Sequence, residues 1–257
     1  RPRAHSMPTD SGARIVDSIE ARMGSSRLPG KVLMDTHGRP ALAWLVERLR
    51  AVPQLDDIIL ATTTSPGDAE LAAWAEANGV ACHRGSEEDV LGRVVGAQQQ
   101  AGGDIVVEVT GDCTLICPDV ISLGIETFLA NDCDVVSNCG KVQTFPLGAD
   151  VQVFPRKLLE DVAANINDPA VREHVSLHFY ESPDYNVINL IAPQAWRIPG
   201  ARLQLDYVED HQFIETVLAE LVPRHGAVFG LDVLAKLLNA RPDILTINAD
   251  CEEKAPR

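Results

Sequence analysis

Short apolar runs alternate with longer amphipathic segments through the first half of the chain. The runs have the length and composition of buried strands, and the segments between them follow the 3.6-residue period of helices. Strands are expected at 14–20, 57–63, 80–84, 104–109 and 133–137, and helices at 40–51, 67–78, 87–101 and 118–131. Such strict alternation predicts an α/β fold with a mostly parallel sheet that is covered by helices on both faces.

The pattern changes after residue 140. Residues 140–154 predict an extended, hairpin-like excursion that bends at Pro146-Leu147-Gly148. Beyond it we expect helices at 155–164, 170–181, 208–222 and 230–240, and strands at 185–191, 202–206 and 244–248. Without a linker to divide them, residues 13–257 are expected to form a single domain, whereas residues 1–12 lack periodicity and are expected to be disordered.

Composition and charge exclude several classes of protein. The 37 acidic residues outnumber the 22 lysines and arginines, which gives a net charge of −15 and argues against a nucleic-acid partner. No apolar run approaches the roughly 20 residues of a membrane span, so we expect no membrane partner. The six cysteines form no C-x-x-C pair, which favours reduced thiols and a cytoplasmic location. Because the first residue is Arg, either Met7 is the native start or the chain is a segment of a longer polypeptide.

The stretch 21–33, ARMGSSRLPGKVL, follows the first expected strand and concentrates positive charge in an acidic chain. A glycine-bearing loop after a strand can aim backbone amides at an anion, and Arg22, Arg27 and Lys31 add charge suited to a triphosphate. The alternative is a solvated turn with scattered basic residues. The loop is not a P-loop, because Val32 follows Lys31 where Ser or Thr is needed, and it lacks the G-x-G-x-x-G pattern.

This stretch resembles the signature A-R-x-x-S-x-R-L-P-G-K of the cytidylyltransferases that activate acidic sugars, in particular the branch named for spore-coat polysaccharide biosynthesis. Sialic-acid and 3-deoxy-octulosonate cytidylyltransferases are related to that branch. The resemblance implies a three-layer Rossmann-like nucleotidyltransferase fold with CTP as donor and Mg²⁺ as cofactor. The residues of this stretch that the resemblance places at the nucleotide are Ala21, Arg22, Met23, Gly24, Ser25, Arg27 and Lys31.

Two carboxylates stand at the ends of expected strands. Asp112 follows 104–109 in VEVTGDCTLICP, and Asp206 ends the strand-like 202–206 in RLQLDYVED. On residue type alone each is an ordinary turn or helix-start residue, since acidic residues favour a helix N-terminus. The family pattern makes both Mg²⁺ ligands, and it implies a catalytic set of Arg22, Lys31, Asp112 and Asp206.

Three further segments carry the same resemblance, which spans about residues 14–222. Residues 84–94 resemble the loop that lines the base and ribose, which adds Ser86 and Asp89 to the nucleotide site, as Gly111 does beside Asp112. Residues 144–154 and Arg172-Glu173-His174 resemble acceptor-side segments. They imply acceptor-binding roles for Gly148, Asp150, Arg172 and His174. Departures from the family pattern, expected to lie near the acceptor, stand at Thr114, Cys117, Leu147, Gln152 and Gln204.

The resemblance implies transfer of CMP from CTP to an acceptor oxygen of a sugar acid or related small molecule, with release of pyrophosphate. A phosphonate, phosphate or sugar-phosphate acceptor, in one domain of a larger enzyme, is the alternative reaction. Another nucleoside triphosphate is the alternative donor. A non-catalytic nucleotide-binding module is the alternative of another class, but such a module would be expected to lose Asp112 or Asp206.

Two other sites carry less weight. Asp132-Cys133-Asp134 fits the D-x-D pattern of glycosyltransferases but precedes its strand, and so stands at the wrong end of the sheet. His174 and His178 share one face of the expected helix and could hold zinc, but no third ligand stands out. Related enzymes are dimers, and the apolar residues of 140–154 predict a homodimer built partly on this excursion.

Overall fold

The structure is a computed structural model that describes residues 12–140, 142–176, 178–179 and 182–252. Its strands are β1 (Ile15–Glu20), β2 (Asp35–Thr36), β3 (Arg39–Pro40), β4 (Asp57–Thr63), β5 (Ala81–Gly85), β6 (Ile105–Thr110), β7 (Val135–Ser137), β8 (Gln152–Pro155) and β9 (Val187–Asn189). Its α-helices are α1 (Ala41–Arg50), α2 (Ala69–Ala77), α3 (Val90–Ala101), α4 (Pro118–Ala130), α5 (Arg156–Asn165), α6 (Pro169–Glu173), α8 (Val208–His225), α9 (Leu231–Ala240) and α10 (Pro242–Leu245). Short 3-10 turns are η1 (Lys31–Leu33), η2 (Pro66–Asp68) and η3 (Gln194–Trp196). Of the segment expected to be disordered, residues 1–11 lie outside the described residues.

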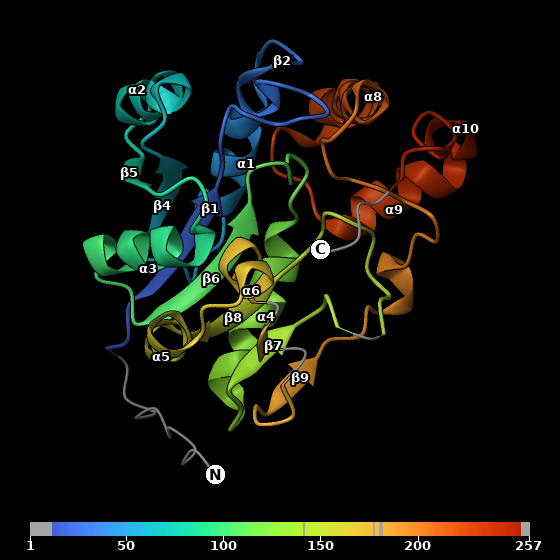
Figure 1. Ribbon diagram of the computed structural model, residues 1–257. Helices are drawn as coiled ribbons and strands as arrows, with labels where there is room; N and C mark the ends of the chain where they lie inside the picture. Colours follow the sequence, from blue (N-terminus) through green and yellow to red (C-terminus); the bar gives the residue numbers. More distant parts are fainter. Residues whose placement is uncertain (1–11, 141, 177, 180–181, 253–257) are drawn as a thin grey trace.

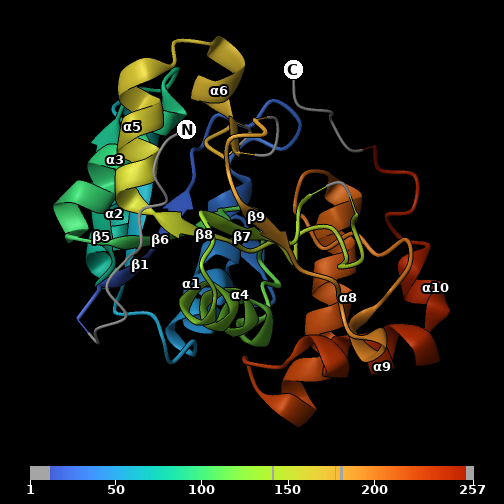
Figure 2. The same cartoon turned by 90° about the horizontal axis from the view of Figure 1, so that it is seen from below.

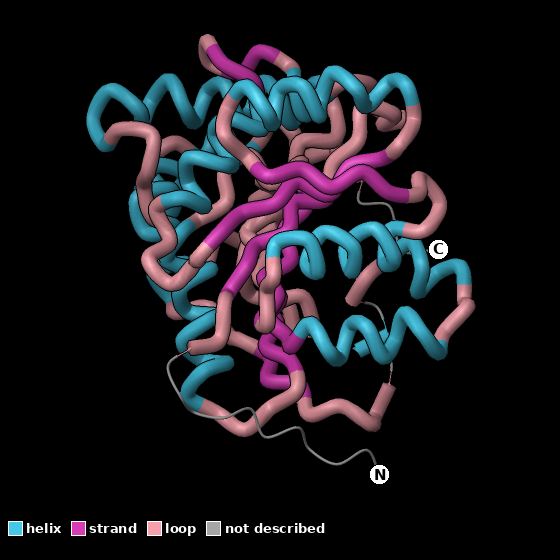
Figure 3. Tube along the Cα trace, turned by 90° about the vertical axis from the view of Figure 1, so that its left-hand side faces the viewer, coloured by secondary structure: helices cyan, strands magenta, loops and turns pink. Residues whose placement is uncertain are grey.

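Seven strands form one sheet in the order β5-β4-β1-β6-β8-β7-β9 (Figure 1). β5, β4, β1 and β6 are parallel neighbours, β8 runs antiparallel between β6 and β7, and β9 is parallel to β7. The sheet lies as a layer between helices (Figure 3). The predicted three-layer α/β fold with a mostly parallel sheet is therefore confirmed.

Each face of the sheet has its own apolar core. α3, α5 and the residues after α6 pack on one face, around Val16, Val106, Phe154 and Phe179. α1, α4 and α8 pack on the opposite face, and α8–α10 form a group at one side of the molecule (Figure 2). Both faces of the central strands are buried, which explains why these strands read as continuous apolar runs.

Element boundaries follow local signals where the sequence supplies them. α2 ends at Ala77, and Gly79 just beyond it has a φ of 63°, the left-handed conformation that favours glycine at a helix end. α3 begins at Val90, later than expected, because the Asp89 side chain accepts a hydrogen bond from the amide of Gly92 and caps the helix.

Three elements expected in the second half of the chain are wrong. Residues 202–206 form no strand, and only an isolated bridge joins Arg202 to Leu147. The strand expected at 244–248 overlaps the short helix α10, which starts at Pro242 because proline suits the first helical position. The helix expected over 170–181 is interrupted after Glu173, so His174 and His178 do not share one continuous helix face.

The expected excursion at 140–154 connects β7 to β8, and these two strands pair antiparallel at its base, as in a hairpin. β8 also pairs with β6 and therefore lies inside the main sheet. Phe145, Val151 and Phe154 are at most 5% exposed, so most of the apolar surface that motivated a dimer is buried within the chain. Among the described residues, no helix has the length and apolar character needed to cross a membrane.

Candidate active site

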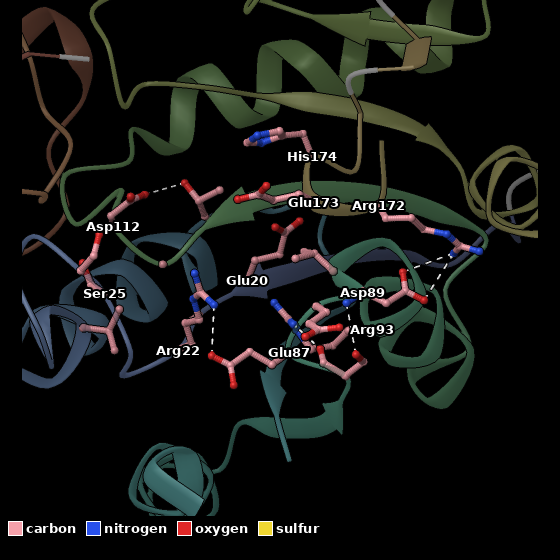
Figure 4. A pocket seen from close by; sticks show the side chains of 18 of the residues that line it. Glu20, Arg22, Ser25, Glu87, Asp89, Arg93, Asp112, Arg172, Glu173 and His174 are labelled. Carbon is pink, nitrogen blue, oxygen red and sulfur yellow. Dashed lines mark hydrogen bonds and ion pairs between the residues drawn. The ribbon is translucent and has the colours of Figure 1, made fainter. Parts of the chain in front are cut away.

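A cavity of about 1580 Å³ opens at the carboxyl ends of β1 and β6 (Figure 4). This edge is where ligands bind in open α/β sheets. Lining residues that the sequence predicted are Ala21, Arg22, Ser25, Arg27, Lys31, Ser86, Asp89, Gly111, Asp112, Arg172, His174 and Asp206. Met23, Gly24, Gly148 and Asp150 were also predicted for the site but are not part of this lining.

The ends of β1 and β6 lie in close contact. The amide of Gly111 donates to the carbonyl oxygen of Glu20 at 2.8 Å. A Cβ at position 111 would lie 2.7 Å from the Cβ of Ala21, so only glycine allows this approach. The contact brings the loop at 21–33 beside Asp112.

Some amides of the 21–33 loop, among them those of Met23, Ser25, Gly30 and Lys31, donate to oxygens within the protein. The expected anion cradle would use other amides of the loop and stays a prediction. The side chains of Arg22, Arg27 and Lys31 line the cavity and supply positive charge. Arg22 reaches Glu87 at 3.2 Å, and both of these side chains are about half exposed.

Lys31 lies between the two predicted carboxylates. Its Nζ donates to Oδ2 of Asp112 at 2.9 Å and to Oδ1 of Asp206 at 2.8 Å. Burial alone would raise the pKa of Asp112, but the Lys31 ammonium and hydrogen bonds from Thr110 and Lys31 outweigh it, and the pKa is lowered. Burial opposes the charge of Lys31, yet the two carboxylates raise its pKa. Lys31 and Asp112 are thus held in their charged forms.

A buried network fixes Asp206. Its Oδ2 accepts from Arg202 at 2.9 Å and pairs with Arg27 at 2.9 Å. Arg202 also donates to Asp210, which accepts from the backbone amides of Asp206 and Tyr207. Asn248 donates to Oδ1 of Asp210 at 2.8 Å and to the carbonyl of Arg202 at 3.0 Å. A residue from the C-terminal segment, in which the sequence showed no motif, therefore supports a carboxylate of the site.

The carboxylate pair fits a magnesium ion in its chemistry. Oxygens from Asp112 and Asp206 already converge on one cation, the Lys31 ammonium. Carboxylate oxygens are hard ligands, and Mg²⁺ is commonly bound by one or two carboxylates together with substrate phosphates. Within the described part of the chain, no group of three or more His, Cys, Asp and Glu could hold a metal by itself, which also leaves the zinc alternative without support.

The sequence did not reveal a second acidic group in the cavity. Glu20 ends β1 and lines the cavity, and Glu108 lies on β6 behind it. Burial raises the pKa of Glu20 to about 7, and it raises the pKa of Glu108 well above its ordinary value. We call Glu20 and Glu108 the acidic floor. The only indication of these two residues in the sequence was a charged residue near the end of each apolar run.

α6 covers one side of the cavity and is tied to α3. The Nη1 of Arg172 lies 3.3 Å from Oδ1 of Asp89, the residue that caps α3, and its Nη2 donates to the carbonyl of Ala163 (Figure 4). Arg93 and Glu173, which the sequence did not single out, line the same space. The acceptor roles of Arg172 and His174 stay predictions.

Two of the departures from the family pattern lie away from the acceptor side. Thr114 and Cys117 are fully buried, and burial raises the pKa of the Cys117 thiol to about 12.

Gly148 has a φ of 84°, and a Cβ there would lie 2.7 Å from the amide nitrogen of Gln204. This glycine therefore serves a close backbone approach, and its acceptor role stays a prediction.

A parallel sheet with a lysine and two aspartates at its carboxyl edge is the arrangement of a nucleotidyltransferase enzyme. The family model described as Cytidylyltransferase matches residues 18–222. The chain belongs to the cytidylyltransferase family.

Individual relatives agree with this assignment. An uncharacterized Methanocaldococcus jannaschii protein is 34% identical over 95% of this chain and 98% of its own. The Bacillus subtilis spore coat polysaccharide biosynthesis protein SpsF is 32% identical over 89% of this chain and 95% of its own. A solved cytidylyltransferase from Leptospira borgpetersenii superposes with a TM-score of 0.84 and 28% identity, covering 91% of this chain and 97% of its own.

Proposed function

We propose that this protein is a Mg²⁺-dependent cytidylyltransferase that moves CMP from CTP to an oxygen of a small-molecule acceptor and releases pyrophosphate. The observation that carries the proposal is the convergence of Asp112 and Asp206 on one cation at the carboxyl edge of the sheet. The 26% identity over 94% of the chain to a 3-deoxy-manno-octulosonate cytidylyltransferase of Xanthobacter autotrophicus supports CTP as donor and a sugar acid as acceptor.

The acidic and the basic side chains of the cavity have different proposed roles. Asp112 and Asp206 would hold the metal, which when bound neutralises phosphate charge and orients the reacting groups. Arg22, Arg27 and Lys31 bind the triphosphate and stabilise the leaving pyrophosphate. Lys31 already contacts both carboxylates, so it moves from their oxygens to the phosphates when the nucleotide binds. In-line attack by the acceptor oxygen needs no nucleophilic side chain, because positioning and charge supply the rate.

Ser86 and Asp89 lie on the β5 side of the cavity, where the base and ribose are proposed to bind. Arg172 forms an ion pair with Asp89, and His174 lies further toward Asp112, so the acceptor is proposed to bind between His174 and Asp112. A phosphonate, phosphate or sugar-phosphate acceptor fits the same chemistry. A non-catalytic nucleotide-binding module is disfavoured, because it would have no need to retain both carboxylates and the lysine between them.

Pyrophosphate release tests the proposal. The protein is incubated with Mg²⁺ and each of the four nucleoside triphosphates, against 3-deoxy-manno-octulosonate, other polyhydroxylated 2-keto acids, sugar phosphates and phosphonates. We expect release that needs both CTP and one acceptor. Release with another nucleotide alone would change the donor, and an inert protein that still binds CTP would favour the binding module.

We also propose a homodimer, although most of the apolar residues of 140–154 are buried within the chain. Val142 is the exposed apolar residue in the described part of this segment, at 56%. Light scattering at micromolar concentration should show a dimer, and Val142→Asp should shift it toward monomer. Phe145→Asp is unsuitable, because Phe145 packs against Trp196 inside the fold. A wild-type monomer would refute the dimer.

A further inference from the structure

Along the strands of the sheet, in the direction of the cavity, the side chains change from apolar to polar at the position of the acidic floor. Below this level, Val106 of β6 pairs with Phe154 of β8, and both are fully buried in the core. One step toward the cavity, the pairing registers place a polar side chain on each of five adjacent strands. These residues are Ser18, Glu108, Gln152, Ser137 and Asn189.

This polar row has a direction. On the β4 side of β1, the partners of Ser18 and Glu20 are Ile59 and Ala61, which are buried and apolar. The row therefore extends only from β1 toward β6, β8, β7 and β9. That half of the sheet lies away from β5, Ser86 and Asp89, where the nucleotide is proposed to bind. The polar row thus lies mainly in the half that is left to the acceptor, and Arg93, which donates to the carbonyl of Ser86 at 2.6 Å, connects it to the nucleotide side.

Polar atoms at this place lack partners within the described residues. Oε1 of Glu20, Oε2 of Glu108, Oγ of Ser18 and Nε of Arg93 are buried and make no hydrogen bond. Arg93 is 4% exposed, lines the cavity, and its charge acts on Glu20. Leaving buried polar atoms unpaired is unfavourable, so a ligand that pairs them would bind favourably.

The floor favours one type of ligand group. Burial raises the pKa of both carboxyl groups of the floor, and Arg93 near Glu20 supplies a positive charge. A ligand carboxylate would meet carboxyl oxygens and be repelled, whereas an ammonium would compete with a charge that Arg93 already supplies. A hydroxyl group can donate to Glu20 and accept from Arg93, which satisfies both.

We propose that Glu20 determines acceptor specificity by binding hydroxyl groups of a polyhydroxylated acceptor, and that Glu108 is a positioning residue that holds Glu20. Glu20 lies in the centre of the cavity between Arg93 and Glu173 (Figure 4). Glu108 is 7% exposed, and the strand register pairs it with Ser18, two residues before Glu20 on the same face of β1. The proposal rests on the proposed function, because it concerns the acceptor of that same reaction.

A binding experiment without turnover tests the proposal first. Saturation-transfer NMR, with a non-hydrolysable CTP analogue and Mg²⁺ present, compares 3-deoxy-manno-octulosonate and gluconate with hexanoate, which has a carboxylate but no hydroxyl groups. Glucosaminate, in which an ammonium replaces one hydroxyl, tests the amine. We expect the hydroxyl-rich compounds to bind to the wild type and hexanoate not to bind. Equal binding of hexanoate, no binding of any hydroxyl-rich probe, or a preference for glucosaminate would overturn the proposal.

The variants are Glu20→Gln and Glu108→Gln, with Glu76→Gln on the exposed surface of α2 as the control outside the cavity. Glu20→Gln should weaken binding of the hydroxyl-rich probe by about tenfold or more, Glu108→Gln by less, and Glu76→Gln by less than about twofold. Far-UV circular dichroism establishes that each variant is folded. A folded Glu20→Gln with wild-type affinity overturns the proposal.

Pyrophosphate kinetics then separate this proposal from the proposed function. Glu20→Gln should raise KM for the acceptor about tenfold and leave KM for CTP within about twofold. A rise in KM for CTP instead would place Glu20 at the nucleotide and overturn the proposal. If no acceptor gives pyrophosphate but the NMR contrast holds, the proposed function fails and the hydroxyl-binding floor stands.

Discussion

Asp112 and Asp206 form one carboxylate pair of the cavity, and Glu20 and Glu108 form the other. Lys31 bridges the first pair, and Arg27 and Arg202 both contact Asp206. The acidic floor has Arg93 near Glu20, but its buried oxygens Oε1 of Glu20 and Oε2 of Glu108 make no hydrogen bond among the described residues. The pKa of Asp112 is accordingly lowered, whereas burial raises the pKa of Glu20 and of Glu108.

The difference shows that the position of a carboxylate at the sheet edge does not decide its chemistry. Both pairs lie at or beneath one cavity, and both are largely buried. Lys31 holds the pKa of Asp112 low, whereas burial raises the pKa of Glu20 and of Glu108, so the first pair is proposed to bind a metal and the second to act as a hydrogen-bonding surface. Variants that change the charge of one pair or of its partners test this difference between the two pairs.

Removing charge from the first pair should have the largest effect. Asp112→Asn and Asp206→Asn should each lower kcat about 100-fold or more, because a metal ligand is lost. Initial rates of pyrophosphate release at saturating Mg²⁺ measure the loss. Asp232→Asn, on the surface of α9, is the control. Near-normal rates in both aspartate variants would remove these residues from the metal site.

Lys31→Ala should weaken the binding of CTP far more than the binding of CMP. Calorimetric titration should show that binding of CTP weakens about tenfold or more, while binding of CMP changes by less than about twofold, because Lys31 is proposed to contact the outer phosphates. Lys236→Ala on the surface of α9 should change neither affinity. Equal losses for CTP and CMP would place Lys31 elsewhere.

Asn248→Ala tests the network behind Asp206. The loss of its hydrogen bonds to Asp210 and Arg202 should lower kcat about tenfold and leave KM for CTP within about twofold. Thr246→Ala, on the nearby surface, is the control. A wild-type kcat in a folded Asn248→Ala protein would make this residue structural only.

Glu20→Gln should change the pH dependence of stability, which is the smallest effect. The pKa of Glu20 is raised from 4.5 in the unfolded chain to about 7 in the fold. The folded state therefore binds the extra proton, and stability from this group is full below about 4.5 and lost as pH rises to about 7. The difference in melting temperature between Glu20→Gln and wild type should grow in favour of the variant across this range. A difference that is constant with pH would contradict the raised pKa.

The sequence predicted the strands that position the site because each is a short, largely apolar run with a polar residue at its end. β1, β4 and β6 and the loops after β1 and β6 therefore lay near their expected positions. The prediction of secondary structure failed where tertiary contacts, and not the local pattern of apolar and polar residues, determine the conformation. Residues 202–206 are extended and buried but have only one bridge to pair with, at Leu147.

The supporting residues could not be predicted, because their partners are distant in sequence. Asn248 contacts Asp210 and Arg202 across a long stretch of chain. Arg48, fully buried in α1, donates to the carbonyls of Ile116, Ala227 and Phe229, and so ties the loop after Asp112 to the C-terminal segment. An arginine in an amphipathic helix gives no sign of this role.

Manganese binding in the presence of CTP tests the contrast between the two pairs most directly. Electron paramagnetic resonance measures free Mn²⁺ in titrations of wild type, Asp112→Asn, Asp206→Asn and Glu20→Gln. We predict that both aspartate variants lose about tenfold or more in Mn²⁺ affinity, while Glu20→Gln binds as the wild type does. Loss of Mn²⁺ binding in Glu20→Gln, with binding retained in the aspartate variants, would contradict the account.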